Sequence, residues 1–139
     1  MQIITNNFNV KTKGFTDIID ITSEIQKKVD ESGFKEGNVL VFVPGATAGI
    51  TTIEYEPGLL KDYPEFMEKI VPSNKSYHHD MTWHDGNGFS HIRAALQGAS
   101  FQVPFSKGTL LLGTWQQIIL TDFDNRGRTR KVITQIIGE

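Results

Sequence analysis

TLLLGTWQQIILTDF, residues 109–123, is the stretch that decides the fold of this 139-residue chain. Its large apolar residues occupy odd positions, such as Trp115 and Ile119, and even positions, such as Leu120. A strand with this pattern is expected to have both of its faces buried. Because the stretch exceeds the ~3–10 residues of an ordinary strand, we expect a bulge or bend at Gly113.

Outward from this stretch, the remaining segments predict a mainly stranded protein with two or three helices. Alternating and β-branched runs indicate strands, and apolar residues at helical spacing indicate helices. Strands are expected near 4–10, 38–43, 48–54, 100–105 and 129–137, and helices at 23–32, 57–70 and 90–96. Short connections favour antiparallel pairing, since a parallel pair needs a long crossover. The predicted class is α+β with a largely antiparallel β-sheet core, in a single domain over residues 1–139.

Local signals set several of these boundaries. Ser23 and Gln26 have the spacing of a capping box, and Ser90 is a suitable N-cap for the last helix. Pro64 is expected to divide the middle helix. The 38–43 run is apolar on both parities, which predicts a strand buried on both faces, and residues 72–88 are expected to form a loop.

Composition excludes several classes of function. The net charge of −2 gives no global positive field for nucleic acid, and the absence of cysteine removes disulfides, thiolate metal sites and cysteine nucleophiles. The longest apolar run, Val39–Val43, is far below the ~20 residues needed to span a bilayer. The first residues lack the pattern of a signal peptide. We therefore expect a cytoplasmic protein whose partners are neither nucleic acid nor membrane.

All four histidines of the chain lie within HHDMTWHDGNGFSH, residues 78–91. Imidazole binds zinc and similar metals and moves protons near neutral pH. If this segment folds back on itself, three histidines can converge on one ion, with Asp80 and Asp85 as ligands or as partners of a ring N–H. The expected metal ligands are His79, His84 and His91. The alternative is a solvated loop whose side chains share no focus.

Three other segments could bind or transform a ligand. The small residues after Gly45 let a ligand approach the backbone, with the Thr47 hydroxyl as a contact and Glu54 as a base. The turn at 85–88 and the helix N-terminus at Ser90 could bind an anion. Arg126, Arg128 and Arg130 alternate along one face and could hold a phosphate. Each also has an ordinary explanation: a plain hairpin, a capped turn and a solvated strand end beside Asp122 and Asp124.

The chain resembles the YjbQ-like family, also called the secondary thiamine-phosphate synthase family, over nearly its whole length. The most specific match is SFQVPFSKGTLLLGTWQQIIL at residues 100–120, which has the family pattern around LGTWQ. Further matches are WHDGNG and SH at 83–91, TTIEYEPGLLKD at 51–62, and the FDNR ending. The chain departs from the family pattern in two places: Pro44-Gly45-Ala46 stands where many members carry a histidine in a PHT-type motif, and Phe89 stands where the closer branch often has one.

This resemblance implies a compact α+β protomer that assembles as a homotrimer. It implies a divalent metal, often zinc, held by histidines in a pocket near the subunit boundary, and site positions at Asp85, Asn87, Ser90 and Glu54. It also implies a weak activity that joins a pyrimidine pyrophosphate to a thiazole phosphate.

We therefore predict a metal-dependent enzyme that acts on a phosphorylated small molecule. The histidines would bind the metal, Asp85 would orient a histidine or activate water, and Glu54 would act as base. Thr47, Asn87, Ser90, Arg126 and Arg128 would contact the substrate or its phosphate. The alternatives are a non-catalytic trimeric protein that binds a metal or small ligand, and a purely structural domain with solvated histidines.

Overall fold

Two antiparallel sheets form the framework of the protein, in a computed structural model that describes residues 1–139. The predicted α+β class with antiparallel sheets is confirmed, although there are four helices rather than two or three. The strands are β1 Gln2–Lys11, β2 Asp17–Asp20, β3 Glu36–Phe42, β4 Ala48–Ile53, β5 Ser100–Ser106, β6 Thr109–Leu110, β7 Gln117–Asp122 and β8 Thr129–Gly138. The helices are α1 Thr22–Ser32, α2 Pro57–Ile70, α3 His78–Trp83 and α4 Gly88–Gln97.

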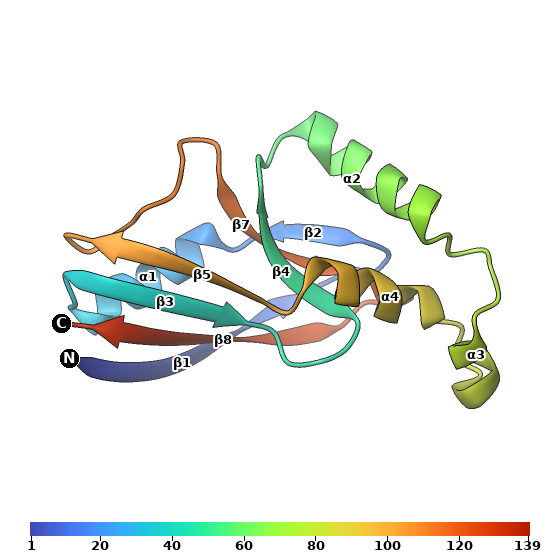
Figure 1. The fold of residues 1–139 in the computed structure, drawn as a ribbon, viewed down its shortest axis with the longest axis horizontal. Coiled ribbons are helices and arrows are strands. Elements are labelled where there is room, and N and C mark those ends of the chain that lie inside the picture. The colour runs from blue at the N-terminus through green and yellow to red at the C-terminus, as the bar shows by residue number, and fades with distance from the viewer.

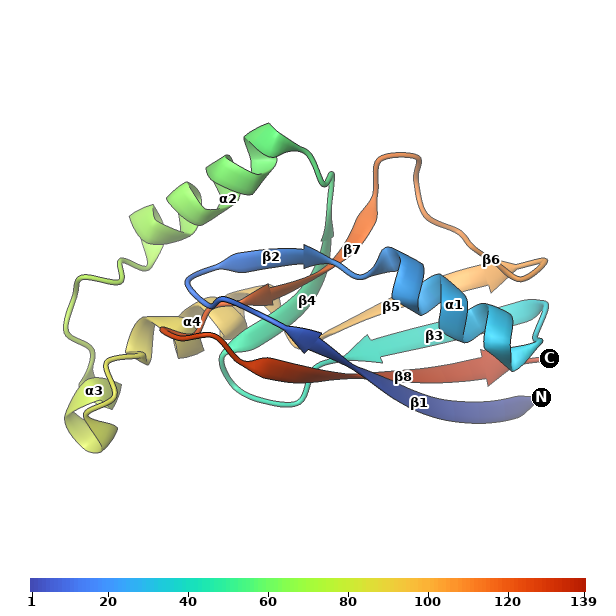
Figure 2. The ribbon, with the colours of Figure 1, turned by 180° about the vertical axis from the view of Figure 1, so that it is seen from behind.

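The larger sheet has the order β1-β8-β3-β5-β6, and the smaller one has the order β2-β7-β4. The long strands of the larger sheet lie side by side in Figure 1, with both chain termini at the same end. The core lies between the two sheets and α1, which comes to the front in Figure 2. Its buried side chains include Ile25 of α1, Val41 of β3, Leu120 of β7 and Val132 of β8.

The stretch 109–123 is not one bent strand, and this expectation was wrong. It divides into β6 and β7, which belong to different sheets, and residues 111–116 form a connecting loop. The Gln116 side chain closes this loop by accepting a hydrogen bond from the Gly113 N–H at 3.1 Å. Leu111 and Trp115 are exposed on the loop, whereas Ile119 is fully buried in β7.

Other local expectations also need correction. The strand at 38–43 is buried on one face only, because Val39 and Val41 face the core while Phe42 is exposed. Ser23 forms no capping box: α1 begins at Thr22 without a side-chain cap, and Gln26 instead binds backbone atoms of Gly108 and Leu110. The reason is a tertiary contact. The Gln26 amide forms hydrogen bonds with the Gly108 carbonyl and the Leu110 N–H at the edge of the sheet.

The helices differ from expectation in three places. Pro64 does not divide α2, which runs continuously past it. The predicted loop at 72–88 contains the short helix α3. Ser90 is not an N-cap but lies buried inside α4, which begins two residues earlier and has Asn87 at its N-cap position.

Buried Arg93 of α4 ties three segments together. Its guanidinium donates to the Val71 carbonyl at the end of α2, to the Thr16 hydroxyl between β1 and β2, and to the Glu68 carboxylate at 2.7 Å. Partial burial raises the pKa of Glu68, but hydrogen bonds from Ser73 and Arg93 outweigh it and bring that pKa below its ordinary value. The ion pair therefore stabilises the attachment of α2 while Glu68 is ionised.

We expect Glu68→Gln to lower the unfolding midpoint near neutral pH but not in acid. Because the folded-state pKa lies below the ordinary value of 4.5, the contribution of the carboxylate is complete above that value. It is lost as the pH falls through the folded-state pKa. Thermal unfolding of both proteins from about pH 7 to about pH 3 checks this. The two curves should converge in acid, and curves that stay parallel would contradict the assignment.

Candidate metal centre

The α3–α4 pair brings two of the predicted histidines together. The link from His84 to Asn87 reverses the chain direction through two left-handed residues, His84 with φ 58° and Gly86 with φ 69°. As a result, the ring centroids of His79 in α3 and His91 in α4 lie 4.2 Å apart, with 40° between the ring planes. Figures 1 and 2 show this pair of helices at the end of the molecule away from the chain termini.

Two carboxylates lie beside His79. Its Nδ1 atom is 3.7 Å from Asp85 Oδ1 and 4.0 Å from Asp80 Oδ1. Asp80 accepts hydrogen bonds from the Tyr77 N–H and the Gly88 N–H, and these bonds lower the pKa of its carboxyl. Asp85 is exposed and its carboxylate makes no hydrogen bond, so it is the carboxylate free to bind a ligand.

These donor atoms fit a divalent ion. His79 Nδ1 is buried and has no hydrogen-bond partner, which leaves its lone pair or proton unused. One ligand atom each from His79, Asp80 and Asp85 lies within 4.8 Å of the others. Ligand atoms about 2.1 Å from a tetrahedral zinc lie roughly 3.4 Å apart, so the 3.7 Å between His79 and Asp85 is close to the required separation.

His91 is a further imidazole beside these donor atoms, in ring contact with His79. Burial and the neighbouring His79 lower the pKa of His91 below its usual range, against opposing effects of Asp85 and Asp124. The imidazole is therefore neutral near pH 7 and has a lone pair to offer. His91 also lines a cavity of about 360 Å³ whose other walls are small residues: Gly45, Ala46, Ala48, Ala94, Ala95, Gly98 and Ala99.

Two predicted residues do not join this cluster. His84 is exposed in a left-handed conformation at the end of α3, where it caps the helix. Glu54 is exposed after the last residue of β4, whereas Thr47 precedes the first. The six residues of β4 separate them by roughly 20 Å, and Thr47 is the one of the two at the end of β4 nearer to the α3–α4 pair.

Three of the five predicted phosphate contacts, Thr47, Asn87 and Arg128, converge on a buried carboxylate instead. Asp124, with no exposed surface, accepts hydrogen bonds from Asn87 at 3.2 Å, Thr47 at 3.2 Å and Arg128 Nε at 2.8 Å. Burial raises the pKa of Asp124, but hydrogen bonds from Asn87, the Asn125 backbone and Arg128 outweigh it and lower that pKa overall.

The third arginine of the series is bound in the same way. Arg130 donates to Asp122 from Nε and from Nη2, each at 2.8 Å, and to the Thr47 hydroxyl. The two aspartates balance Arg128 and Arg130, while Arg126 is exposed and makes no ion pair. The three arginines therefore do not form an open phosphate site. The N-terminus of α4 is not open either, because Asp80 already binds its Gly88 N–H.

Sequence reasoning placed Asp122 and Asp124 beside a solvated strand end, and it missed that both are buried in this region and that Asn125 joins them. The available signal was the alternation of Asp122 and Asp124 with Thr121 and Phe123 at the end of an apolar strand. Carboxylates that continue a buried strand need cationic partners, and arginines follow within a few residues.

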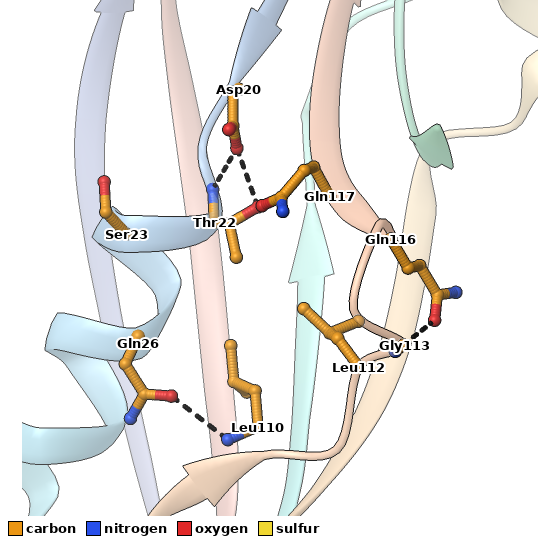
Figure 3. Close-up of a pocket in the computed structure, with 9 residues that line it drawn as sticks. All are labelled: Asp20, Thr22, Ser23, Gln26, Leu110, Leu112, Gly113, Gln116 and Gln117. Atoms are coloured by element: carbon orange, nitrogen blue, oxygen red, sulfur yellow. Dashed lines mark hydrogen bonds between the residues drawn. The ribbon is translucent and has the colours of Figure 1, made fainter. Parts of the chain in front are cut away.

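A second cleft, of about 390 Å³, lies between the first turn of α1 and the 111–116 loop (Figure 3). Two of its three side-chain amides are already used: Gln26 binds the Leu110 N–H, and Gln116 binds the Gly113 N–H and Thr52. Asp20 in turn binds the Thr22 backbone and hydroxyl. The cleft contains no histidine, so the α3–α4 pair is the better candidate for a functional site.

Fold and site together define an α+β protein with two antiparallel sheets and a histidine–carboxylate cluster on peripheral helices. The chain belongs to the family described as UPF0047 protein YjbQ-like, whose model matches residues 6–139. The resemblance seen at residues 100–120 is thus confirmed. No helix combines the length and apolar character required to cross a membrane.

Known relatives cover nearly the whole chain. A UPF0047 protein of Archaeoglobus fulgidus is 43% identical over 128 residues, which is 92% of this chain and 97% of that one. A crystal structure of a Sulfolobus solfataricus protein, described as a YbjQ-like protein of unknown function, has a TM-score of 0.93 at 31% identity, and the match covers 99% of both chains. A Clostridium acetobutylicum structure of the same family has a TM-score of 0.87 at 41% identity, over 95% of this chain and 99% of that one.

Proposed function

We propose that this protein binds one divalent metal ion, with zinc as the first candidate, and acts on a phosphorylated small molecule. His79, His91 and Asp85 would hold the ion. The observation that carries the proposal is the buried Nδ1 atom of His79, which has no hydrogen-bond partner and lies 3.7 Å from a free carboxylate. A bound cation would neutralise the negative charge of a phosphate group at this position.

Neighbouring groups support a small ligand beside the ion. Asn87 donates to Asp124 through Nδ2, but its buried Oδ1 atom has no partner and can accept a hydrogen bond. The cavity of small residues next to His91 gives room for an uncharged part of the ligand. Arg126, the one arginine of the series without an ion pair, is the cation available for an outer phosphate.

Our specific proposal for the reaction is a weak thiamine-phosphate-synthase-like transfer, which releases pyrophosphate when a pyrimidine pyrophosphate joins a thiazole phosphate. We also propose self-assembly as a homotrimer, supported by the large apolar side chains of Leu111 and Trp115 exposed on the 111–116 loop.

Two observations favour a non-catalytic binding protein as the second candidate. Glu54, the expected base, lies at the far end of β4, and Arg128 and Arg130 are neutralised by buried aspartates. The site of one protomer thus contains ligand-type donors without a separate general base. Such a site could carry or sense a metal-bound ligand.

A pyrophosphate-release assay on untagged protein tests the proposal. With both thiamine precursors, we expect slow release that stops when a chelator removes the metal and resumes when zinc is restored. Zinc binding without any release would support the carrier. Release that is unchanged by the chelator would contradict the role of the metal.

A further inference from the structure

The turn that joins α3 to α4 has little support of its own. Residues 84–87 form no strand pairing, and two of them adopt left-handed conformations. Within the helix pair, Asp80 binds the Gly88 N–H, but the Asp85 carbonyl and the Asn87 side chain are held by side chains from elsewhere in the chain. The positions of these residues determine whether Asp85 and His91 face His79.

Two residues that follow β7 supply those contacts. The Asn125 side chain donates from Nδ2 to the Asp85 carbonyl at 2.7 Å. It lies over the turn, since a methyl group placed on Gly86 would be 3.9 Å from Asn125 Nδ2. On the other side, Asp124 Oδ1 accepts from the Asn87 side chain at 3.2 Å and from the Asn125 N–H at 2.8 Å.

The anchor of these contacts is rigid. Asp124 follows β7, the central strand of the smaller sheet, and is fully buried. Its second oxygen accepts from Thr47 and Arg128, so four donors fix the carboxylate. The sheet therefore determines where the peripheral turn lies.

The geometry assigns Asp124 and Asn125 as positioning residues for the metal centre, and this role rests on the proposed function. We call the contacts from Asn125 to Asp85, and from Asp124 to Asn87 and Asn125, the turn brace. The brace holds the Asp85–Asn87 turn in the one arrangement that points Asp85 and His91 toward His79. Neither residue touches the ion. They restrict the ligand side chains to few conformations before the ion binds. Less conformational entropy is therefore lost on binding.

Asn125→Ala tests the brace with little risk to folding, because this half-exposed side chain bonds only to the turn. The matched control is Asn74→Ala, since Asn74 is exposed in a different loop and makes no side-chain hydrogen bond. Zinc affinity is measured by competition with a chromophoric chelator. Hydrogen exchange of residues 84–88 is measured in metal-free protein, and the unfolding midpoint is recorded for each variant.

We expect Asn125→Ala to weaken zinc binding about 10- to 100-fold, with an unfolding midpoint close to that of the wild type. Exchange in the turn should become roughly 2- to 10-fold faster, the effect of one lost hydrogen bond. Asn74→Ala should match the wild type in all three measurements. Asp124→Asn, which keeps the size of the side chain, should change affinity in the same direction.

Equal zinc affinity for Asn125→Ala and Asn74→Ala would overturn the positioning role, as would unchanged exchange in the turn. A wild-type protein that binds no zinc would instead overturn the proposed metal centre, and the positioning role with it. These outcomes are distinguished by which protein fails to bind.

Discussion

His91→Ala is expected to abolish zinc binding and to leave the fold intact. His91 is partly exposed and its ring contacts His79, so its removal opens no large core cavity. Loss of one of three protein ligands should weaken zinc binding by more than the roughly 10- to 100-fold seen when a supporting residue is lost. Elemental analysis and chelator competition on untagged protein measure the effect, and circular dichroism checks the fold.

His84→Ala is the matched control for this prediction. The sequence places His84 among the ligands, whereas the structure places it exposed at the end of α3, and the ring that contacts His79 is that of His91. We therefore expect His84→Ala to bind zinc as the wild type does, and His79→Ala to lose binding like His91→Ala. Retained stoichiometric zinc in His91→Ala, or loss of zinc in His84→Ala, would show that a different set of ligands binds the ion.

Arg130→Met is expected to destabilise the protein by about 3–5 kcal/mol, because it leaves a buried carboxylate without its cation. Asp122 has no exposed surface, and the Arg130 side chain is only 10% exposed. Asp122 would retain the Thr12 hydroxyl and the Asp124 N–H as donors, but neither carries a charge. Urea unfolding of the wild type and the variant measures the difference.

Two further variants make this prediction specific. Arg126→Met removes an exposed arginine with no ion pair and should change stability by no more than about 0.5 kcal/mol. Asp122→Asn combined with Arg130→Met removes both charges and should recover part of the lost stability. If Arg126→Met and Arg130→Met were equally mild, the buried ion pair would not stabilise the fold.

The elements that local patterns specify could be predicted from the sequence. Ile25 and Val29 at helical spacing with Gly33 after them gave α1, and Gly33 does end it in a left-handed conformation. The prediction of one strand over residues 109–123 was wrong, because hydrophobic periodicity indicates which faces are buried but not which sheet a strand joins. The division into β6 and β7 depends on distant partners, namely β5 for one and β2 and β4 for the other.

The site was predictable as a region but not as a ligand set. Four histidines within 14 residues indicated a focus. Which of them converge depends on α3, a helix too short for its pattern to be recognised, and on the left-handed backbone of His84. The pairing of Arg128 and Arg130 with buried aspartates likewise depends on tertiary structure. Their alternating spacing predicts that they share one face of a strand, but it does not predict which side chains they contact.

Anomalous X-ray diffraction from zinc-loaded crystals tests the central claim most directly. We predict one zinc peak within about 2.0–2.2 Å of a ring nitrogen of His79 and of His91, with an Asp85 oxygen completing the protein ligands. A zinc peak at another set of side chains, or no zinc peak beside His79 and His91 at saturating zinc, would contradict this prediction.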